Sequence, residues 1–160
     1  METNETRIQV KKVLWPTDFS SSAKEALPYI TSLTMQYGAE IHVLYVIEDI
    51  AHHESWYGDF DKNNIDKLMQ WANKSAQKRL DQICGKYLEG CPLYIKHIAV
   101  GDPAQEILKL IDQEKIDLVV MASHGQKGYF RFGSVTEKVL KNSSVPVTTI
   151  PVDVKETSAS

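Results

Sequence analysis

Residues 93–121 read LYIKHIAVGDPAQEILKLIDQEKIDLVVM, and this stretch predicts the architecture of the whole chain. It opens and closes on apolar runs, Leu93–Val100 and Leu118–Met121, which are typical of strands buried in a parallel sheet. Between them, Asp102 and Pro103 have the residue types favoured at the start of a helix. Apolar residues then recur at helical spacing, at Ala104, Ile107, Leu108 and Ile111. The stretch therefore predicts a strand–helix–strand unit.

The same alternation recurs on both sides of this unit. Further strands are expected at 13–15, 41–47 and 145–152, and further helices at 20–37, 65–87 and 134–142. Strands that alternate with helices predict an α/β protein, with an open parallel sheet covered by helices on both faces. Pro28 falls inside the first helical pattern, where it should remove one backbone hydrogen bond and bend the helix axis.

The composition is that of an ordinary globular domain. The chain has 160 residues, of which 42% are hydrophobic and 24% are charged, enough for one domain with a core. The net charge of −3 offers no basic excess for nucleic-acid binding. The sequence has no apolar run of membrane-spanning length and no signal-peptide core, so we expect no membrane partner.

Cysteine usage and the ends of the chain add two expectations. Cys84 and Cys91 fit neither a CxxC nor a zinc pattern, so we expect reduced thiols in a cytoplasmic protein. The polar ends predict flexible segments at 1–8 and 154–160, on either side of a single domain at 9–153.

Two loops are candidates for a binding site. In an open parallel sheet, ligands bind beyond the carboxyl ends of strands, where the strand order reverses. Residues 16–18, PTD, follow the first strand, and residues 121–136, MASHGQKGYFRFGSVT, join the fourth strand to the last helix. If these two strands are neighbours, both loops face one crevice.

The second loop has the residue types of an anion-binding helix start. Gly133, Ser134, Val135 and Thr136 would supply free backbone N–H groups, and the hydroxyls of Ser134 and Thr136 add donors for a phosphate. Alternatively, Ser134 is only a helix cap and the glycines only form turns. His124 could contact a phosphate or order the turn. The residues alone leave these interpretations open.

Asp18 is the candidate in the first loop. Its carboxylate could accept hydrogen bonds from ribose hydroxyls, or it could cap the helix that follows. No GxxxxGK[ST], GxSxG or HExxH motif occurs, so we predict binding rather than catalysis and assign no catalytic residue. Residues 52–61, HHESWYGDFD, carry adjacent metal-binding side chains, but adjacent side chains on a loop rarely converge on one ion. We therefore predict no metal site.

Four blocks of sequence, in order along the chain, are similar to those of one known family. They are KKVLWPTDFSSSAKEAL at 11–27, HVLYVIED at 42–49, VGDPAQEILKLIDQEKIDLVVMASHG at 100–125 and GSVTEKVLKNSSVPVTTI at 133–150. Over about residues 9–152 the chain resembles the universal stress proteins. The resemblance implies a five-stranded parallel sheet of order 3-2-1-4-5 with four helices. It also implies a cytoplasmic homodimer that pairs through the last strand, here at Val145, Val147 and Thr149.

One branch of that family binds ATP through the pattern G-x2-G-x9-G-[ST] after the fourth strand. The pattern falls on Ala122, Gly125, Gly133 and Ser134 of this chain. Asp18 matches the family's adenosine-contacting aspartate, and the backbone at the position of Val46 holds adenine. The resemblance thus implies a site for ATP, ADP or AMP, with or without Mg²⁺, at Pro16, Thr17, Asp18, Val46, Ala122, Ser123, His124, Gly125, Gly133, Ser134, Val135 and Thr136.

The chain departs from that pattern in two places. Ala122 replaces the first glycine, and its methyl group is tolerated only if the backbone φ stays negative. The segment 126–132, QKGYFRF, has seven residues instead of nine, which would reshape the wall that faces the phosphates. We expect a nucleotide-binding regulatory or interaction module of the stress response. The alternatives are a dimer that acts through protein partners without a nucleotide, and a slow ATPase.

Overall fold

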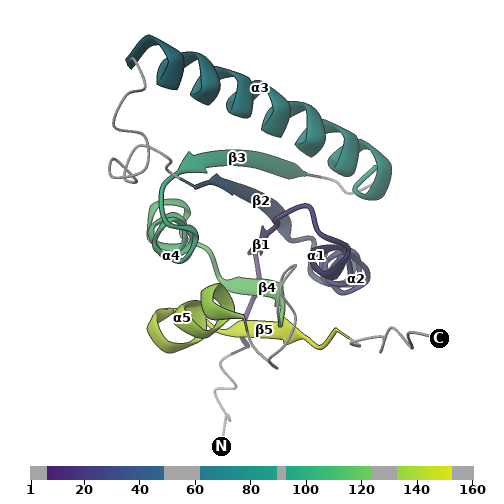
Figure 1. The fold of residues 1–160 in the computed structure, drawn as a ribbon. Helices are drawn as coiled ribbons and strands as arrows, with labels where there is room; N and C mark the ends of the chain where they lie inside the picture. The colour runs from purple at the N-terminus through teal and green to yellow at the C-terminus, as the bar shows by residue number, and fades with distance from the viewer. Residues whose placement is uncertain (1–6, 49–61, 90–92, 124–132, 153–160) are drawn as a thin grey trace, which may run out of the picture.

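A computed structural model describes residues 7–48, 62–89, 93–123 and 133–152 (Figure 1). Five strands alternate with helices along the chain. The strands are β1 (Lys12–Pro16), β2 (Glu40–Ile47), β3 (Tyr94–Val100), β4 (Leu118–Ala122) and β5 (Val147–Ile150). The helices are α1 (Ser21–Lys24), α2 (Leu27–Tyr37), α3 (Lys62–Tyr87), α4 (Pro103–Glu114) and α5 (Ser134–Asn142).

The five strands form one sheet of order β3-β2-β1-β4-β5, in which every neighbouring pair is parallel. This confirms the expected α/β fold and strand order. Leu14 in the central strand β1 is aligned with His42 on one side and with Val119 on the other. The chain moves outward from β1 to β3 and then resumes at β4, so the reversal of strand order lies between β1 and β4.

Helices cover both faces of the sheet, as Figure 1 shows. Because side chains alternate along a strand, Val13 and Trp15 of β1 point to one face and Leu14 to the other. The first two belong to a core cluster shared with α1, α2 and α3, whereas Leu14 packs in a second cluster with α4 and α5. The two cores explain why the central strands are apolar along their whole length.

The first helical segment differs from its prediction. One continuous helix with Pro28 in its interior is wrong, because the segment is divided into α1 and α2 and Pro28 lies in the first turn of α2. A proline ring clashes with the carbonyl four residues earlier, which here is that of Lys24, the last residue of α1. In the turn between the two helices, the carbonyl of Ala23 accepts from the N–H of Ala26 at 3.3 Å and from the indole nitrogen of Trp15 at 3.1 Å. When α1 and α2 are taken together as one broken helix, each of the four connections between strands contains a helix, as expected.

The strand–helix–strand unit that predicted the fold forms as expected. Asp102 is the N-cap of α4, and its side chain accepts a hydrogen bond from the backbone N–H of Gln105 at 3.0 Å. The buried stripe contains Leu110 rather than Leu108, which is only partly buried. Cys84 is fully buried on α3, and this burial raises the pKa of its thiol to about 11. The thiol therefore stays protonated at neutral pH.

A pair of histidines, of which His42 is buried and His97 is half-buried, lies beneath α4. His42 on β2 is fully buried, and its Nδ1 lies 2.8 Å from Nε2 of His97 on β3. The other ring nitrogen of His42 lies 2.6 Å from a carboxylate oxygen of Glu40. Each contact needs a single proton, so a neutral pair satisfies the chain when His97 donates to His42 and His42 donates to Glu40.

Candidate functional site

The candidate site lies where the carboxyl ends of β1 and β4 meet. The two strands are adjacent and parallel, so the loops that follow them leave the same edge of the sheet. They then diverge, because the chain continues from β1 toward β2 and from β4 toward β5. This is the switch point at which open α/β sheets bind ligands.

The loop after β1 is ordered by short-range hydrogen bonds. The N–H of Thr17 donates to the carbonyl of Leu44 at 2.9 Å, which ties the loop to β2. The carboxylate of Asp18 accepts from the N–H of Ser20 at 2.9 Å, and Ser20 itself caps α1 by accepting from Ala23 at 3.1 Å. Asp18 is therefore not the helix cap, and its side chain is exposed at the edge of the sheet.

The backbone of Val46 faces the same edge. In a parallel pair, alternate residues of a strand bond to the same neighbour. Leu44 bonds toward β1, so Val46 turns its N–H and C=O to that side as well. The pairing of β1 with β2 ends at Pro16 and Leu44, which leaves Val46 past the last aligned pair. Its polar backbone groups therefore border the crevice.

Hydrogen bonds hold the end of β4 to the start of α5 and to β5. The buried hydroxyl of Thr136 donates to the carbonyl of Ala122 at 3.1 Å. The N–H of Ser123 donates to the carbonyl of Ile150, and the carbonyl of Ser123 accepts from Gly133, both at 2.9 Å. These bonds bring the two ends of the expected nucleotide loop together. They also commit the hydroxyl proton of Thr136 to the strand, so this side chain is a structural donor rather than a phosphate ligand.

Within the described residues, the first turn of α5 has no side-chain cap, which leaves its amides available to an anion. Its N-cap is Gly133, which carries no side chain to bond the amides of the first turn. The side chain of Ser134 is exposed, whereas that of Val135 packs into the core. The acidic residue of this turn, Glu137, is paired with Lys141 at 2.8 Å, and this bond holds its pKa below the usual value. Backbone amides, rather than side chains, are therefore the main donors here.

The backbone of Ala122 accommodates its methyl group. It is buried at the end of β4, and its φ is not positive, unlike those of Phe19 and Lys115 among the described non-glycine residues. A glycine is therefore not required at this position by the backbone conformation. The absence of the first glycine of the ATP-binding pattern does not distort the strand.

Several predicted site residues lie outside the described part of the chain. These are His124 and Gly125, together with the short segment 126–132. Cys91 and the loop at 52–61 are outside it as well. Within the described ranges, no group of three or more histidine, cysteine, aspartate or glutamate side chains could hold a metal ion. No described helix is long and apolar enough to cross a membrane.

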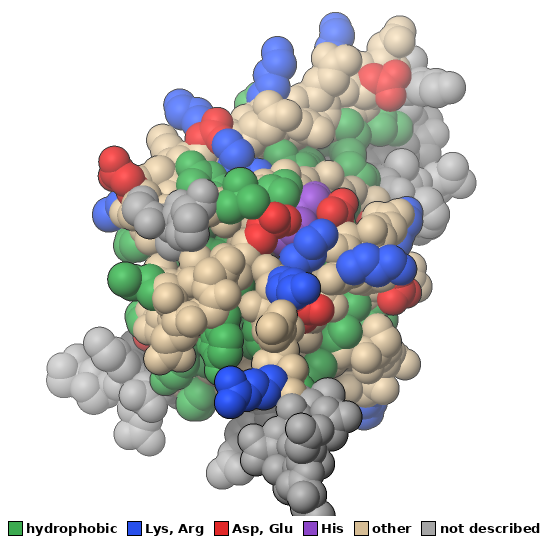
Figure 2. All heavy atoms as spheres, turned by 180° about the vertical axis from the view of Figure 1, so that it is seen from behind, with side chains coloured by type: hydrophobic (Ala, Val, Ile, Leu, Met, Phe, Trp, Pro, Cys, Tyr) green, Lys and Arg blue, Asp and Glu red, His purple; other side chains and the backbone are tan. Residues whose placement is uncertain are grey.

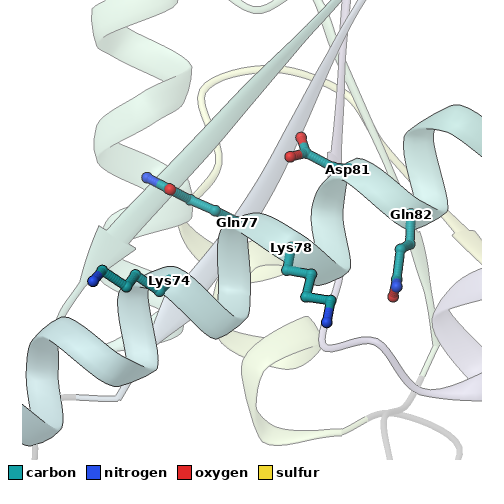
Figure 3. A pocket seen from close by; sticks show the side chains of 5 residues that line it. All are labelled: Lys74, Gln77, Lys78, Asp81 and Gln82. Carbon is teal, nitrogen blue, oxygen red and sulfur yellow. The ribbon is translucent and has the colours of Figure 1, made fainter.

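Two surface hollows lie away from this edge. One, of about 490 Å³, is lined by α3 alone, and Figure 3 shows Gln77 and Asp81 extending to one side of the helix while Lys78 and Gln82 extend to the other. The other, of about 380 Å³, lies between β3 and α4 beside His97. Figure 2 shows histidine atoms between acidic and basic side chains on that face. Both are large enough for a small ligand, but neither is lined mainly by apolar residues, as small-molecule sites typically are.

Comparison with known proteins assigns the chain to a family. The sequence model of the universal stress protein family matches residues 9–151. The chain belongs to the universal stress protein family. It is 31% identical to universal stress protein MJ0577 of Methanocaldococcus jannaschii over 157 residues, which cover 88% of this chain and 94% of that protein. The solved structure of MJ0577 superposes with a TM-score of 0.79 and covers 92% of this chain and 99% of that one.

Two further universal stress proteins share the fold and carry a nucleotide in their structures. A family member from Arabidopsis thaliana with AMP bound gives a TM-score of 0.64 at 21% identity, covering 93% of this chain and 96% of that one. A universal stress protein in complex with cAMP gives 0.58 at 20% identity, covering 90% and 98%. Some members of the family therefore bind adenine nucleotides.

The structure also adds residues that the sequence did not indicate. Phe19, between Asp18 and Ser20, has a left-handed backbone with φ of 63°. Arg79 of α3 lies over its ring, 4.5 Å from the ring centroid. A positive φ at a bulky residue has no sequence signal, since glycine or asparagine would be expected there. The contact with Arg79 joins residues that are far apart in the sequence.

Proposed function

We propose that the protein binds an adenine nucleotide, most directly ATP, in the crevice between the loop after β1 and the start of α5. The observation that carries this proposal is the geometry of the switch point. An exposed carboxylate at Asp18, backbone groups at Val46 and the open first turn of α5 border the same edge of the sheet. Together they offer partners for ribose, adenine and phosphate.

Each part of the nucleotide has a matching group. The carboxylate of Asp18 is an acceptor for ribose hydroxyls, and one of its oxygens already orients it through Ser20. The N–H and C=O of Val46 suit the donor and acceptor edge of adenine. The amides of Ser134, Val135 and Thr136 would bind phosphate oxygens, with the helix dipole favouring the negative charge. Mg²⁺, if present, would be held mainly by the phosphates.

The AMP-bound and cAMP-bound relatives support this proposal. We further propose that the protein is a cytoplasmic homodimer that pairs through the edge strand β5. Val147 and Thr149 lie on this strand, Val145 precedes it, and all three are half-buried. Its function would be that of a regulatory or interaction module of the stress response, in which nucleotide occupancy changes the surface offered to partners. Sedimentation equilibrium at micromolar concentration tests the dimer.

A second function is favoured by one feature of the sequence. The segment 126–132 is two residues shorter than the ATP-binding pattern, so the family's phosphate contacts do not transfer directly to this chain. In that case the protein would act as a dimeric interaction protein without a nucleotide. A slow ATPase, the third possibility, would need a group that positions the attacking water, and the described residues at this edge offer only Asp18.

A substitution at Gly133 tests where the phosphates bind. A valine there would place a branched side chain at the N-cap of α5, between the amides of the first turn and a phosphate. We expect Gly133→Val to lower the affinity for ATP by about tenfold or more, because charge-assisted bonds to phosphate contribute about 1.5–3 kcal/mol each. Isothermal titration measures the affinity, and circular dichroism checks the fold. An unchanged affinity in a folded variant would place the phosphates elsewhere.

A further inference from the structure

Phe19 adopts a backbone conformation that a bulky side chain seldom takes. Its φ is 63°, in the left-handed region, although its side chain is only 7% exposed. Such a conformation is unfavourable for a non-glycine residue and persists only when the surroundings enforce it. Phe19 lies between Asp18 and Ser20, so whatever enforces its conformation also determines where the carboxylate of Asp18 points.

Three contacts hold Phe19 in place. Its N–H donates to the hydroxyl of Thr17 at 3.1 Å. Its ring packs against the ring of Tyr45 on β2, with the two centroids 4.3 Å apart. The guanidinium of Arg79 lies over the ring of Phe19. Its Cζ is 4.5 Å from the ring centroid, which is within the range of a cation–π interaction.

The contact from Arg79 differs from the other two in its origin. Thr17 directly follows β1 and Tyr45 lies on β2, so both belong to the sheet and the loop that leaves it. Arg79 comes from α3, the long helix between β2 and β3. The Arg79 side chain is exposed, so a change at the surface of α3 can affect the loop through the contact of Arg79 with Phe19. Leu80 and Cys84 of the same helix supply buried contacts with the core, and the exposed Arg79 adds a charged contact with the loop.

We propose that Arg79 is a positioning residue of the nucleotide crevice, holding the ring of Phe19 so that residues 17–20 present the carboxylate of Asp18 to the ribose. This inference rests on the proposed function for its ligand. A change that displaces Arg79 on the surface of α3 would then lower the affinity for the nucleotide. Arg79 acts through Phe19 and has no direct bond to the nucleotide.

The first measurement needs no ligand. Amide hydrogen exchange reports the loop directly, because Phe19 and Ser20 each donate a local hydrogen bond. Arg79→Met keeps an unbranched apolar side chain and removes the charge. Because one cation–π contact is lost, we expect these two amides to exchange ~3- to 10-fold faster. Arg79→Lys should keep most of the protection. Lys78→Met, an exposed neighbour on α3, is the charge-matched control and should leave both amides unchanged.

The second measurement compares ligands of increasing charge. If Arg79 acts through Asp18, Arg79→Met should weaken adenosine, AMP and ATP by the same factor, ~3- to 10-fold, because all three contain the ribose. A loss that grows with the number of phosphates would overturn the inference, since Arg79 would then bind phosphate itself. A uniform loss that persists unchanged in an Asp18→Asn background would overturn it as well.

The two measurements separate this inference from the proposed function. If the wild-type protein bound none of the three ligands, the nucleotide proposal would fail, while the exchange rates would still show whether Arg79 holds the loop. If ATP bound but the amides of Phe19 and Ser20 exchanged at wild-type rates in Arg79→Met, the positioning role would be wrong and the nucleotide proposal would stand.

Discussion

At the scale of single residues, the candidate site depends on where backbone groups are left available. Thr17 and Thr136 are predicted site residues, yet the hydroxyl of each orders the local backbone, in the loop after β1 and at the start of α5. Among the described residues, the groups that remain for a ligand include the carboxylate of Asp18, the exposed hydroxyl of Ser134, and main-chain atoms at Val46 and the start of α5. A site of this kind tolerates variation in many side chains but not in the path of the backbone.

Asp18 is the one charged side chain on which the ribose part of the proposal depends. Asp18→Asn keeps an oxygen that can accept from Ser20, so the loop and the stability should change little. The loss of the charge should lower nucleotide affinity by about ten- to a hundredfold, since bonds to charged groups contribute about 1.5–3 kcal/mol. Isothermal titration with ATP measures the effect, with the melting temperature as a control. Equal affinity for both proteins would remove Asp18 from the site.

At the scale of elements, the end of α2 provides a direct test of backbone strain. Gly38 ends this helix with φ of 64°, and an added Cβ would meet no atom within 4 Å. Gly38→Ala should therefore lower the free energy of unfolding by about 1 kcal/mol through strain alone. Gly85 inside α3 is the matched control, because its added Cβ also meets nothing but its φ is helical.

The two glycine variants should move stability in opposite directions. Gly85→Ala should raise the free energy of unfolding by roughly 0.5–1 kcal/mol, as alanine is favoured over glycine inside helices. Urea denaturation measures both. A loss of stability at Gly85 equal to that at Gly38 would show that the backbone conformation is not the cause.

The histidine pair of β2 and β3 makes stability depend on pH. Burial lowers the pKa of His97 below 6.5, with a further lowering from His42, against smaller opposite effects of Glu114 and Glu40. A histidine with a lowered folded pKa binds its proton more readily in the unfolded chain. Its contribution to stability is therefore complete above about pH 6.5 and is lost as the pH falls through the lower, folded pKa.

Denaturation between pH 5 and 8 tests this pair. The wild-type free energy of unfolding should fall as the pH drops below about 6.5, and His97→Gln, which can still donate to His42, should flatten that part of the curve. The same slope in both proteins would assign the pH dependence to other groups.

At the scale of the whole molecule, alternating apolar strands and amphipathic helices were enough to predict the α/β class and most element boundaries. The bounds of α5, Ser134–Asn142, agree with the prediction, because Gly133 and the apolar spacing define that helix locally. The order of the strands came from the family resemblance, since a periodic pattern does not state which strands are neighbours. The last strand is shorter than the predicted 145–152.

The features that the sequence did not predict depend on contacts between distant residues. The break between α1 and α2 combines a local cause, Pro28, with a bond from Trp15 to Ala23 that only the folded sheet provides. The contact between His42 and His97 requires the alignment of β2 with β3, which the sequence pattern does not state. The strained backbone of Phe19 and its contact with Arg79 arise in the same way.

Nucleotide binding by the purified protein is the most direct test of the central claim. The protein is denatured, any released nucleotide is identified by chromatography, and ATP is then titrated into protein that has been stripped and refolded. We predict that an adenine nucleotide is released, or that stripped protein binds ATP with a dissociation constant below millimolar. No released nucleotide together with no binding at millimolar ATP would contradict the account and favour a dimer that acts without a nucleotide.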